Sequence, residues 1–158
     1  MSKEITAIWV TDDVVLITIK HLPRKMGAVA PIFESFASHG INVDLISQTP
    51  LSSDESVDLS FSVAEKDLNA ALELVAAFRR MQQGVKVDVN PGNTKITLYG
   101  EPMRDTPGCA ARIFRVLADI GTEVKLITTS EVEVSILIDS QDEDKTIAKF
   151  TEVFSCGV

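Results

Sequence analysis

The chain has 158 residues, of which 45% are hydrophobic, and its formal net charge is −8. This length allows one domain or two small ones, with ample apolar content for a core. The acidic balance, with no basic stretch to offset it, argues against a nucleic-acid or anionic-membrane partner. No apolar run is long enough to span a membrane, and two cysteines without a secretory signal indicate a cytoplasmic protein.

Hydrophobic periodicity predicts strands and helices that alternate along the first half of the chain. Two strands are expected before the first helix, because apolar and polar residues alternate on either side of the turn Thr11–Asp13. Pro31 is tolerated only near the first turn of a helix, so the first regular helix is expected to start late, and Asp67 can cap the second. The expected elements are strand Ile5–Val10, strand Val14–Lys20, helix Ala28–Ser38, strand Ile41–Gln48, loop Thr49–Glu55, strand Val57–Val63, a helix that ends at Gln83–Gly84, and strand Val85–Val89.

The second half is built around the stretch Asp105–Gly121 and the strand that follows it to Thr128. Pro107 and Gly108 form a turn, apolar residues then recur at helical spacing, and Gly121 stops the helix. A helix that opens in this way points free backbone N–H groups at what precedes it and can hold a carboxylate. The simpler alternative is a strand-to-helix turn that needs glycine. We also expect a hinge at Pro91–Asn93, a strand at Lys95–Gly100 and a last helix at Asp142–Phe154.

The same pattern occurs twice. With a shift of 81 positions, Leu22–Ser47 repeats the pattern of the second half without a gap, and Gly27 falls on Gly108. Further on, Val57–Val63 matches Val132–Ile138 with a shift of 75 positions, so the first copy carries six more residues between its second and third strands. An internal repeat of this length predicts two similar structural units.

Each copy has the order strand, helix, strand, strand, helix, which suits an antiparallel sheet with helices on one face. Copy one closes with a further strand at Val85–Val89, whereas copy two has no residues left for one. The spare strand Ile5–Val10 is therefore expected to complete copy two, so that copy one is inserted within it. The alternative is a three-stranded copy two with an open edge. The expected domains are residues 14–90 for the first, and residues 5–10 with 94–156 for the second.

Both copies carry motifs of a known family: Lys95–Gly100, Met103–Gly108 and Ile127–Ile138 in copy two, and Gly40–Asp44, Ser47–Gln48 and Val57–Phe61 in copy one. Over essentially its whole length the chain resembles the paired ACT domains in the regulatory region of aspartokinases. The resemblance implies an α+β fold of two ferredoxin-like βαββαβ domains, the first inserted in the second. Nothing in the sequence resembles the family's kinase domain, so we expect a regulatory protein and not an enzyme.

The resemblance also implies amino-acid sensing and allosteric feedback control of amino-acid biosynthesis. In the family, lysine or threonine binds between the first domain of one chain and the second domain of a neighbour, so a homodimer through the ACT domains is expected. The implied partner is a catalytic aspartokinase subunit, and the alternative is a free-standing sensor or assembly module with no kinase partner. Carried over by position, the effector-binding residues are Arg24, Met26, Gly27, Ala28, Asn42, Val43, Asp44 and Gln48 on the first domain, and Glu123, Val124 and Ser130 on the second.

Two positions depart from the family pattern. The first-domain loop, usually Asp-x-Pro-Gly, is here Arg24-Lys25-Met26-Gly27, and the family's asparagine on the opposite strand is Glu123. Backbone N–H groups at the loop can hold an α-carboxylate, which Arg24 also favours, while Arg24 disfavours a ligand with an extra cationic amine. Threonine is therefore expected in preference to lysine, and Gln48 and Asp44 can bond its amine or hydroxyl. The plainer alternative for these polar residues is a solvated edge strand or loop.

The remaining polar groups do not indicate a catalytic or metal site. Cys109 stands at a predicted helix start, where a thiolate is favoured, yet spacing places neither His21 nor His39 to act as its base. Burial behind the turn is the expected role of Cys109. Cysteines and histidines do not cluster at metal-ligand spacing, so we expect no metal, and no cofactor beyond a free amino acid as effector.

Overall fold

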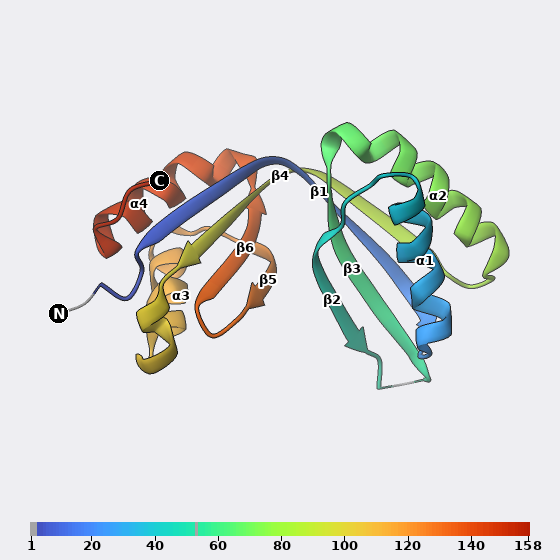
Figure 1. Cartoon of the computed structure of the whole chain (residues 1–158), viewed down its shortest axis with the longest axis horizontal. Helices are drawn as coiled ribbons and strands as arrows, with labels where there is room; N and C mark the ends of the chain where they lie inside the picture. Colours follow the sequence, from blue (N-terminus) through green and yellow to red (C-terminus); the bar gives the residue numbers. More distant parts are fainter. Residues whose placement is uncertain (1–2, 53) are drawn as a thin grey trace. The chain divides into compact units, whose positions relative to one another are not determined.

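The computed structural model describes residues 3–52 and 54–158. The chain divides into two compact units, one of residues 13–91 and one of the residues up to Asp12 together with Gly92–Val158. Strands β1 (Ala7–Pro23) and β4 (Lys86–Tyr99) each run through both units (Figure 1). Hydrogen bonds link the strands in the order β2-β3-β1-β4-β6-β5.

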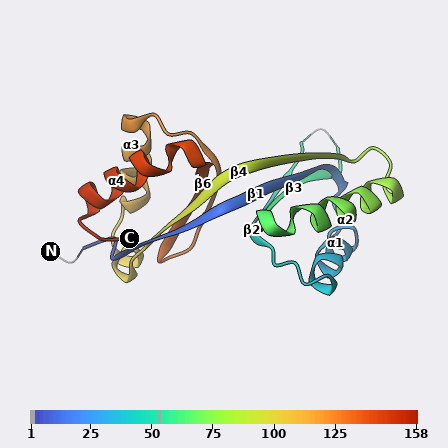
Figure 2. The ribbon, with the colours of Figure 1, turned by 90° about the horizontal axis from the view of Figure 1, so that it is seen from above.

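The unit of residues 13–91 follows the element order expected for copy one. Strand β3 (Ser56–Ala64) pairs antiparallel with β1 on one side and with β2 (Asp44–Pro50) on the other. Helix α1 (Met26–Ser38) joins the first two strands, and α2 (Leu68–Met81) follows a short 3-10 turn, η1 (Glu65–Asp67) (Figure 2). The helices cover one face of the strands, and the core between them includes Val15, Ile17, Ile19, Val29, Ile32, Phe36, Leu59, Phe61, Ala71 and Val75.

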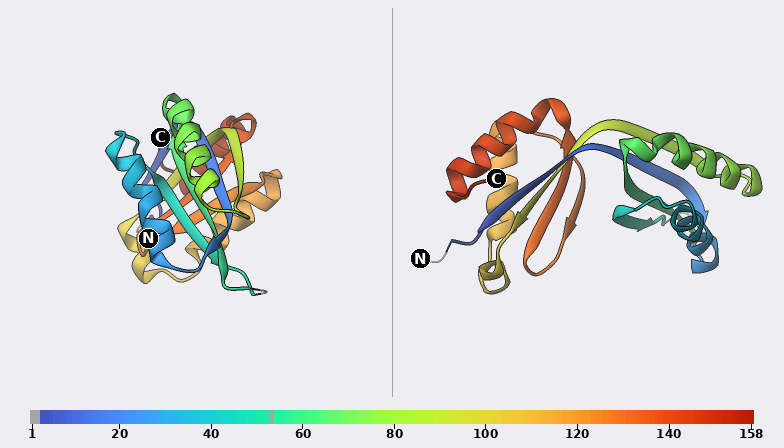
Figure 3. Two further views of the ribbon diagram at one scale, coloured as in Figure 1. Left: turned by 90° about the vertical axis from the view of Figure 1, so that its right-hand side faces the viewer. Right: turned by 45° about the horizontal axis from the view of Figure 1, so that its top comes forward.

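The second unit repeats this order. Strand β6 (Glu133–Asp139) pairs antiparallel with β4 and with β5 (Val124–Thr129). Helices α3 (Cys109–Ile120) and α4 (Glu143–Phe154) cover one face of these strands (Figure 3). Two 3-10 turns, η2 (Glu101–Asp105) and η3 (Ser140–Asp142), lie before the helices. The core includes Ile96, Leu98, Ile113, Leu117, Ile136, Ile138, Phe150 and Phe154.

The start of the chain packs with the second unit. Ile5 and Ile8 are buried among the core side chains of that unit. The N–H of Thr6 donates to the carbonyl of Tyr99 at 2.7 Å. The expected fold class is confirmed: two antiparallel ferredoxin-like repeats, the first inserted in the second.

Two predicted breaks lie inside continuous strands. The turn expected at Thr11–Asp13 is part of β1, and the hinge expected at Pro91–Asn93 is part of β4. The predicted turn is wrong, because these residues continue β1, whereas the predicted hinge coincides with the boundary between the units although its residues belong to β4. The boundary between the units nevertheless falls at these two points, where Asp13 and Gly92 have φ values of +53° and +76°.

Helix α1 and strand β2 differ from their predicted bounds. Helix α1 starts at Met26 rather than late, with Pro31 inside it. Its buried stripe of Val29, Ile32 and Phe36 explains why the helix continues, since core packing outweighs one hydrogen bond lost at a proline. Strand β2 starts three residues later than predicted and continues to Pro50, after a register shift between Asp44 and Ser47. Asp67 is the N-cap residue of α2, as predicted, but its side chain makes no capping hydrogen bond.

Candidate functional site

The connection from β1 to α1, residues 24–28, is named the Gly27 turn. Two hydrogen bonds fix its entry: the N–H of Arg24 donates to the carbonyl of Glu55 at 2.9 Å, and the N–H of Lys25 donates to the carbonyl of Pro23 at 2.7 Å. The N–H of Ala28 is already bound to the Lys25 carbonyl at 2.9 Å. Of the predicted turn residues, Ala28 therefore has no backbone donor to offer a ligand.

The first turn of α1 leaves two other backbone donors open. Lys25 is the N-cap, no side chain caps the helix, and the first turn has no acidic residue. Within residues 3–52 and 54–158, the N–H groups of Met26 and Gly27 have no hydrogen-bond acceptor. Arg24 is exposed and makes no ion pair in that part of the chain. A helix start with a free cation beside it can hold an anion such as a carboxylate.

The predicted residues Asn42–Asp44 lie at the other end of the same sheet. Pro23, which ends β1, pairs with Ser56 at the start of β3, whereas Asp44 pairs with Ser62. The six strand positions between these two pairs span about 20 Å. A single free amino acid is much shorter than this, so one ligand cannot contact both the Gly27 turn and Asn42–Asp44 of the same chain.

Gln48 lies on the same side of the sheet as α1. It pairs with Leu59, whose side chain is in the core beneath the helices, and paired residues of an antiparallel ladder point to the same face. Because β2 is the edge strand, Gln48 remains exposed. Its pairing position is also nearer than that of Asp44 to the strand end that carries the Gly27 turn. Its partner Leu59 lies three positions from Ser56 and three from Ser62, so along the sheet Gln48 stands midway between the Gly27 turn and Asp44.

In the second unit, Glu123 precedes β5 and Val124 is its first residue. Glu123 is exposed and makes no ion pair among the described residues. Its neighbour Lys125 donates to the side-chain oxygen of Asn93 at 2.5 Å, and its amine lies 3.7 Å from the carboxylate of Asp139. Lys125 is therefore engaged elsewhere, and the carboxylate of Glu123 is available to a cationic group.

Ser130 does not lie near Glu123 within one chain, because the whole of β5 separates them. Ser130 instead lines a cavity of about 350 Å³ beside Gly108, at the copy-two turn. The same cavity is lined by Arg104 and Glu131, which form an ion pair of 3.1 Å. The structure therefore assigns Ser130 to the surroundings of the copy-two turn.

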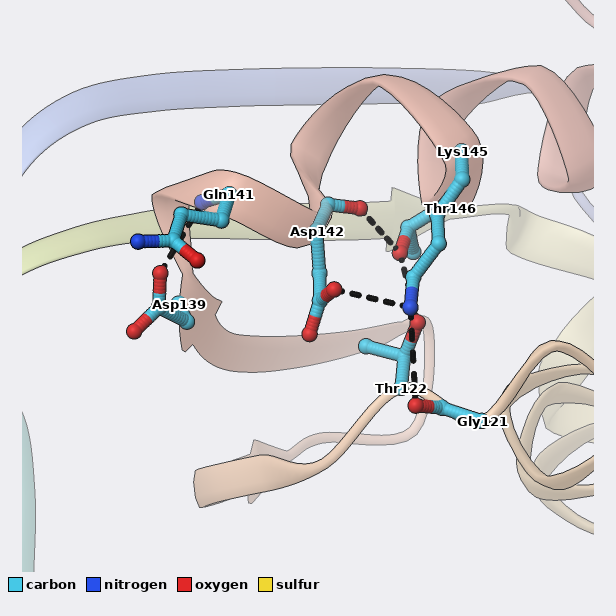
Figure 4. Close-up of polar contacts among 7 residues, drawn as sticks. All are labelled: Gly121, Thr122, Asp139, Gln141, Asp142, Lys145 and Thr146. Carbon is cyan, nitrogen blue, oxygen red and sulfur yellow. Dashed lines mark hydrogen bonds and ion pairs between the residues drawn. The ribbon is translucent and has the colours of Figure 1, made fainter.

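A polar cluster anchors the chain just before β5 (Figure 4). The hydroxyl groups of Thr122 and Thr146 share a buried hydrogen bond of 3.0 Å. The amine of Lys145 bonds the carboxylate of Asp142 at 2.7 Å and reaches the carbonyl of Gly121 at 3.5 Å. These contacts tie the start of β5 to the first turn of α4. They therefore hold the backbone in place next to Glu123, which follows Thr122 in the chain.

Cys109 has the packing role expected of it. It is 4% exposed and belongs to the core under α3. Burial raises the pKa of its thiol, as does the nearby Glu4 carboxylate, while Arg112 lowers it. A protonated, buried thiol is not a nucleophile. The described residues also contain no cluster of three or more histidine, cysteine or acidic side chains that could hold a metal ion.

A groove of about 350 Å³ adjoins the Gly27 turn, and the sequence pattern does not indicate it. Gly27 and Ala28 line it together with apolar residues of α1 and α2, and no charged residue contributes. Its width depends on which side chains meet where the two helices pack, and hydrophobic periodicity does not specify this. The turn thus borders an apolar surface on the helix side.

Comparisons with known proteins give the family. A family model described as "ACT domain" matches residues 20–77 and 96–154. The aspartokinase of Geobacillus stearothermophilus is 35% identical over 143 residues, which are 90% of this chain and 34% of that protein. The chain spans about a third of the length of the curated relatives that it matches. In the part of the chain that the structure describes, no helix is long and apolar enough to cross a membrane.

Two solved structures extend the likeness. Aspartate kinase from Synechocystis has a TM-score of 0.92 at 29% identity, over 99% of this chain and 28% of that one. The ligand-free regulatory subunit of aspartate kinase from Thermus thermophilus has a TM-score of 0.86 at 25% identity, over 96% of this chain and 99% of that one. The chain belongs to the ACT-domain family, with two ACT domains that match the regulatory region of aspartokinases.

Proposed function

We propose that the chain binds a free amino acid of the aspartate family, threonine in preference to lysine, and modulates aspartokinase activity as a separate subunit. Two ACT domains and the likeness to the regulatory region of aspartokinases support the regulatory part of this proposal. The match over nearly the full length of the regulatory subunit from Thermus thermophilus supports a role as a subunit.

The observation that carries the proposal is the distance between the two sets of predicted effector residues. The Gly27 turn and Asn42–Asp44 sit at opposite ends of one sheet, so neither forms a complete site with the other. We infer that the Gly27 turn and Gln48 of one chain face Glu123 and Val124 of a second copy across a homodimer. In this arrangement Asn42–Asp44 reaches a ligand only at a separate position, opposite another part of the second copy.

The charges of the two half-sites match a zwitterion. Arg24 and the open N–H groups of Met26 and Gly27 suit an α-carboxylate, while the Glu123 carboxylate suits an α-ammonium group. The amide of Gln48 can bond a side-chain hydroxyl. An additional ammonium group on the ligand would find Arg24 nearby and no second free carboxylate in these half-sites. This charge balance is the reason to favour threonine over lysine.

Calorimetry on paired variants tests the position of the site. Arg24→Ala and Gln48→Ala each remove one bond to the ligand, and a bond to a charged ligand is worth about 1.5–3 kcal/mol, or roughly tenfold to a hundredfold in affinity. Thr129→Ala is the matched control, because it changes an exposed residue of β5 outside these half-sites. If only the control weakens threonine binding, the site is misplaced.

A kinase assay tests the regulatory role. Added to an aspartokinase catalytic chain, the protein should make activity depend on threonine, and Arg24→Ala should shift that dependence to threonine concentrations about tenfold to a hundredfold higher. Threonine binding without any effect on kinase activity would support the alternative, a sensor or assembly module with no kinase partner.

A further inference from the structure

Two arginine side chains on α2 have no use in the proposed effector site. Arg79 and Arg80 lie exposed in the last turn of α2, and neither makes an ion pair within the described residues. By contrast, Arg104, Arg112 and Arg115 are paired with Glu131, Glu4 and Asp119 respectively. Two adjacent unpaired cations are notable in a chain whose net charge is −8.

The same two arginine residues border an apolar groove of about 500 Å³ between α2 and β4, named the β4 edge groove. The residues of α2 that line it recur at helical spacing, and those of β4 are two positions apart, so each set forms one continuous stripe. No acidic residue lines it. The lining is Leu72, Val75, Ala76, Arg79, Arg80, Val87 and Val89.

The groove lies beside a strand edge that no other described strand covers. Strand β6 pairs with β4 only along Asn93–Tyr99, which leaves residues 86–89 of that edge without a strand partner among the described residues. On the face away from the helices, Asp88 is already engaged by Lys20 at 2.5 Å. Pro91 has no N–H group and ends the usable stretch. Residues 86–89 of this edge therefore border the groove, and alternate residues among them direct their N–H and C=O groups toward it.

We propose that the β4 edge groove binds an extended, acidic segment of another protein, which adds to β4 as a further strand. Backbone hydrogen bonds to the open edge would supply affinity without regard to sequence. On the helix side of the added strand, small aliphatic side chains would fill the groove over Val87 and Val89. An acidic side chain at its end would meet Arg79 and Arg80 and give the specificity.

The geometry limits the chemistry of the occupant. Residues that face the groove must alternate along the segment, because successive side chains of a strand point to opposite faces. Acidic groups belong at the end of the segment near Arg79 and Arg80, since the middle of the groove is apolar. A basic segment would place like charges together. This inference does not depend on the effector site, which uses other residues.

Fluorescence anisotropy with a labelled peptide tests the proposal on the full chain. The probe is the acetylated, amidated peptide Glu-Thr-Val-Thr-Val-Thr-Glu, whose valine and glutamate side chains share one face and which carries an acid at both ends. It should bind below about 1 mM. The same peptide with lysine for glutamate should bind at least about tenfold more weakly, and a central proline should have a similar effect because it disrupts strand pairing.

Charge-reversal variants complete the test. The double variant Arg79→Glu with Arg80→Glu should weaken peptide binding by at least about tenfold. The matched control, Arg115→Glu with Lys149→Glu, makes the same change in net charge on helices of the other unit and should leave binding unchanged. Peptide binding should also slow amide hydrogen exchange along residues 86–90.

Three results would overturn the proposal: no binding of the glutamate peptide at about 1 mM, equal binding of its lysine counterpart, or an arginine double variant that binds as well as the control. Light scattering, which measures the oligomeric state, tests whether a second copy of this chain occupies the groove instead. If the arginine double variant dissociates a dimer of the unmodified chain, the edge groove is occupied by a second copy and not by a partner protein.

Discussion

Gly27 and Gly108 occupy the same position in the repeat but not the same conformation. Gly27 is the second residue of α1, whereas Gly108 precedes α3 as its N-cap with a φ of +94°. A β-carbon at either residue would meet no atom within 4 Å. The two glycines therefore differ in backbone strain and in what lies next to them, and not in available space.

Alanine substitutions separate these roles. Gly27→Ala should leave stability unchanged or raise it by up to about 1 kcal/mol, because alanine is the better helix former. Its methyl group would point back toward the start of α1, where the ligand carboxylate is proposed to bind, so threonine affinity should fall. Gly108→Ala should cost about 1–2 kcal/mol, because φ is positive there, and should leave threonine affinity unchanged. Thermal unfolding and calorimetry measure both; a Gly27→Ala variant with normal affinity would contradict the proposed contact.

A second prediction concerns the passage of the N-terminal segment over Gly100. A β-carbon built at Gly100 would overlap the carbonyl oxygen of Glu4, and its nearest atoms are all backbone. Gly100→Ala should therefore destabilise the protein by about 1–3 kcal/mol, because backbone must move. Gly157→Ala is the control, with no atom within 4 Å and no positive φ. Equal denaturation midpoints for the two variants would show that the segment does not pack as described.

A third prediction separates Lys125 from Glu123. Lys125→Met removes the donor to the fully buried Asn93 and should cost about 1–3 kcal/mol of stability. Because Lys125 is engaged with Asn93 and Asp139, threonine affinity should change little. Glu123→Gln should show the reverse, with normal stability and weaker threonine binding. Urea denaturation and calorimetry on both variants measure this, and a Lys125→Met variant that loses threonine binding while folded would assign that residue to the site.

The buried cysteines predict a loss of stability at alkaline pH. Burial raises the pKa of Cys109 and of Cys156 above the ordinary value of 9.0. A thiol whose pKa is higher in the folded state contributes stability that is complete below the unfolded-state pKa and is lost as pH rises toward the folded-state pKa. Unfolding free energy should therefore decline above about pH 9. The double variant Cys109→Ala with Cys156→Ala should show a weaker decline; the same decline in both proteins would mean that other groups cause it.

The fold could be predicted because the repeat supplied information that no single stretch contains. The strand missing after the last helix of copy two implied a role for Ile5–Val10, and Ile5 and Ile8 do lie in that core. The local turn signal failed at Thr11–Asp13, which continues β1, because strand pairing outweighs the preferences of single residues. At Pro91–Asn93 the chain stays in strand conformation, although the boundary between the units falls there as predicted.

The site could be predicted only in part. Sequence resemblance selects residues but not their positions along a sheet, so the distance between the Gly27 turn and Asp44 depends on the register of β2 with β3. The sequence also did not indicate contacts between residues that are far apart along the chain. The bond from Lys125 to Asn93, which leaves Glu123 without a neighbouring cation, is the clearest case.

The most direct test of a site shared between two copies is complementation between two variants. Arg24→Ala and Glu123→Ala should each weaken threonine binding by about tenfold to a hundredfold in their own homodimers. When they are mixed and allowed to exchange, each mixed dimer contains one site with both residues intact, so calorimetry should recover about a quarter of the normal sites at normal affinity. A mixture with no sites of normal affinity, although native mass spectrometry shows mixed dimers, would contradict the shared site.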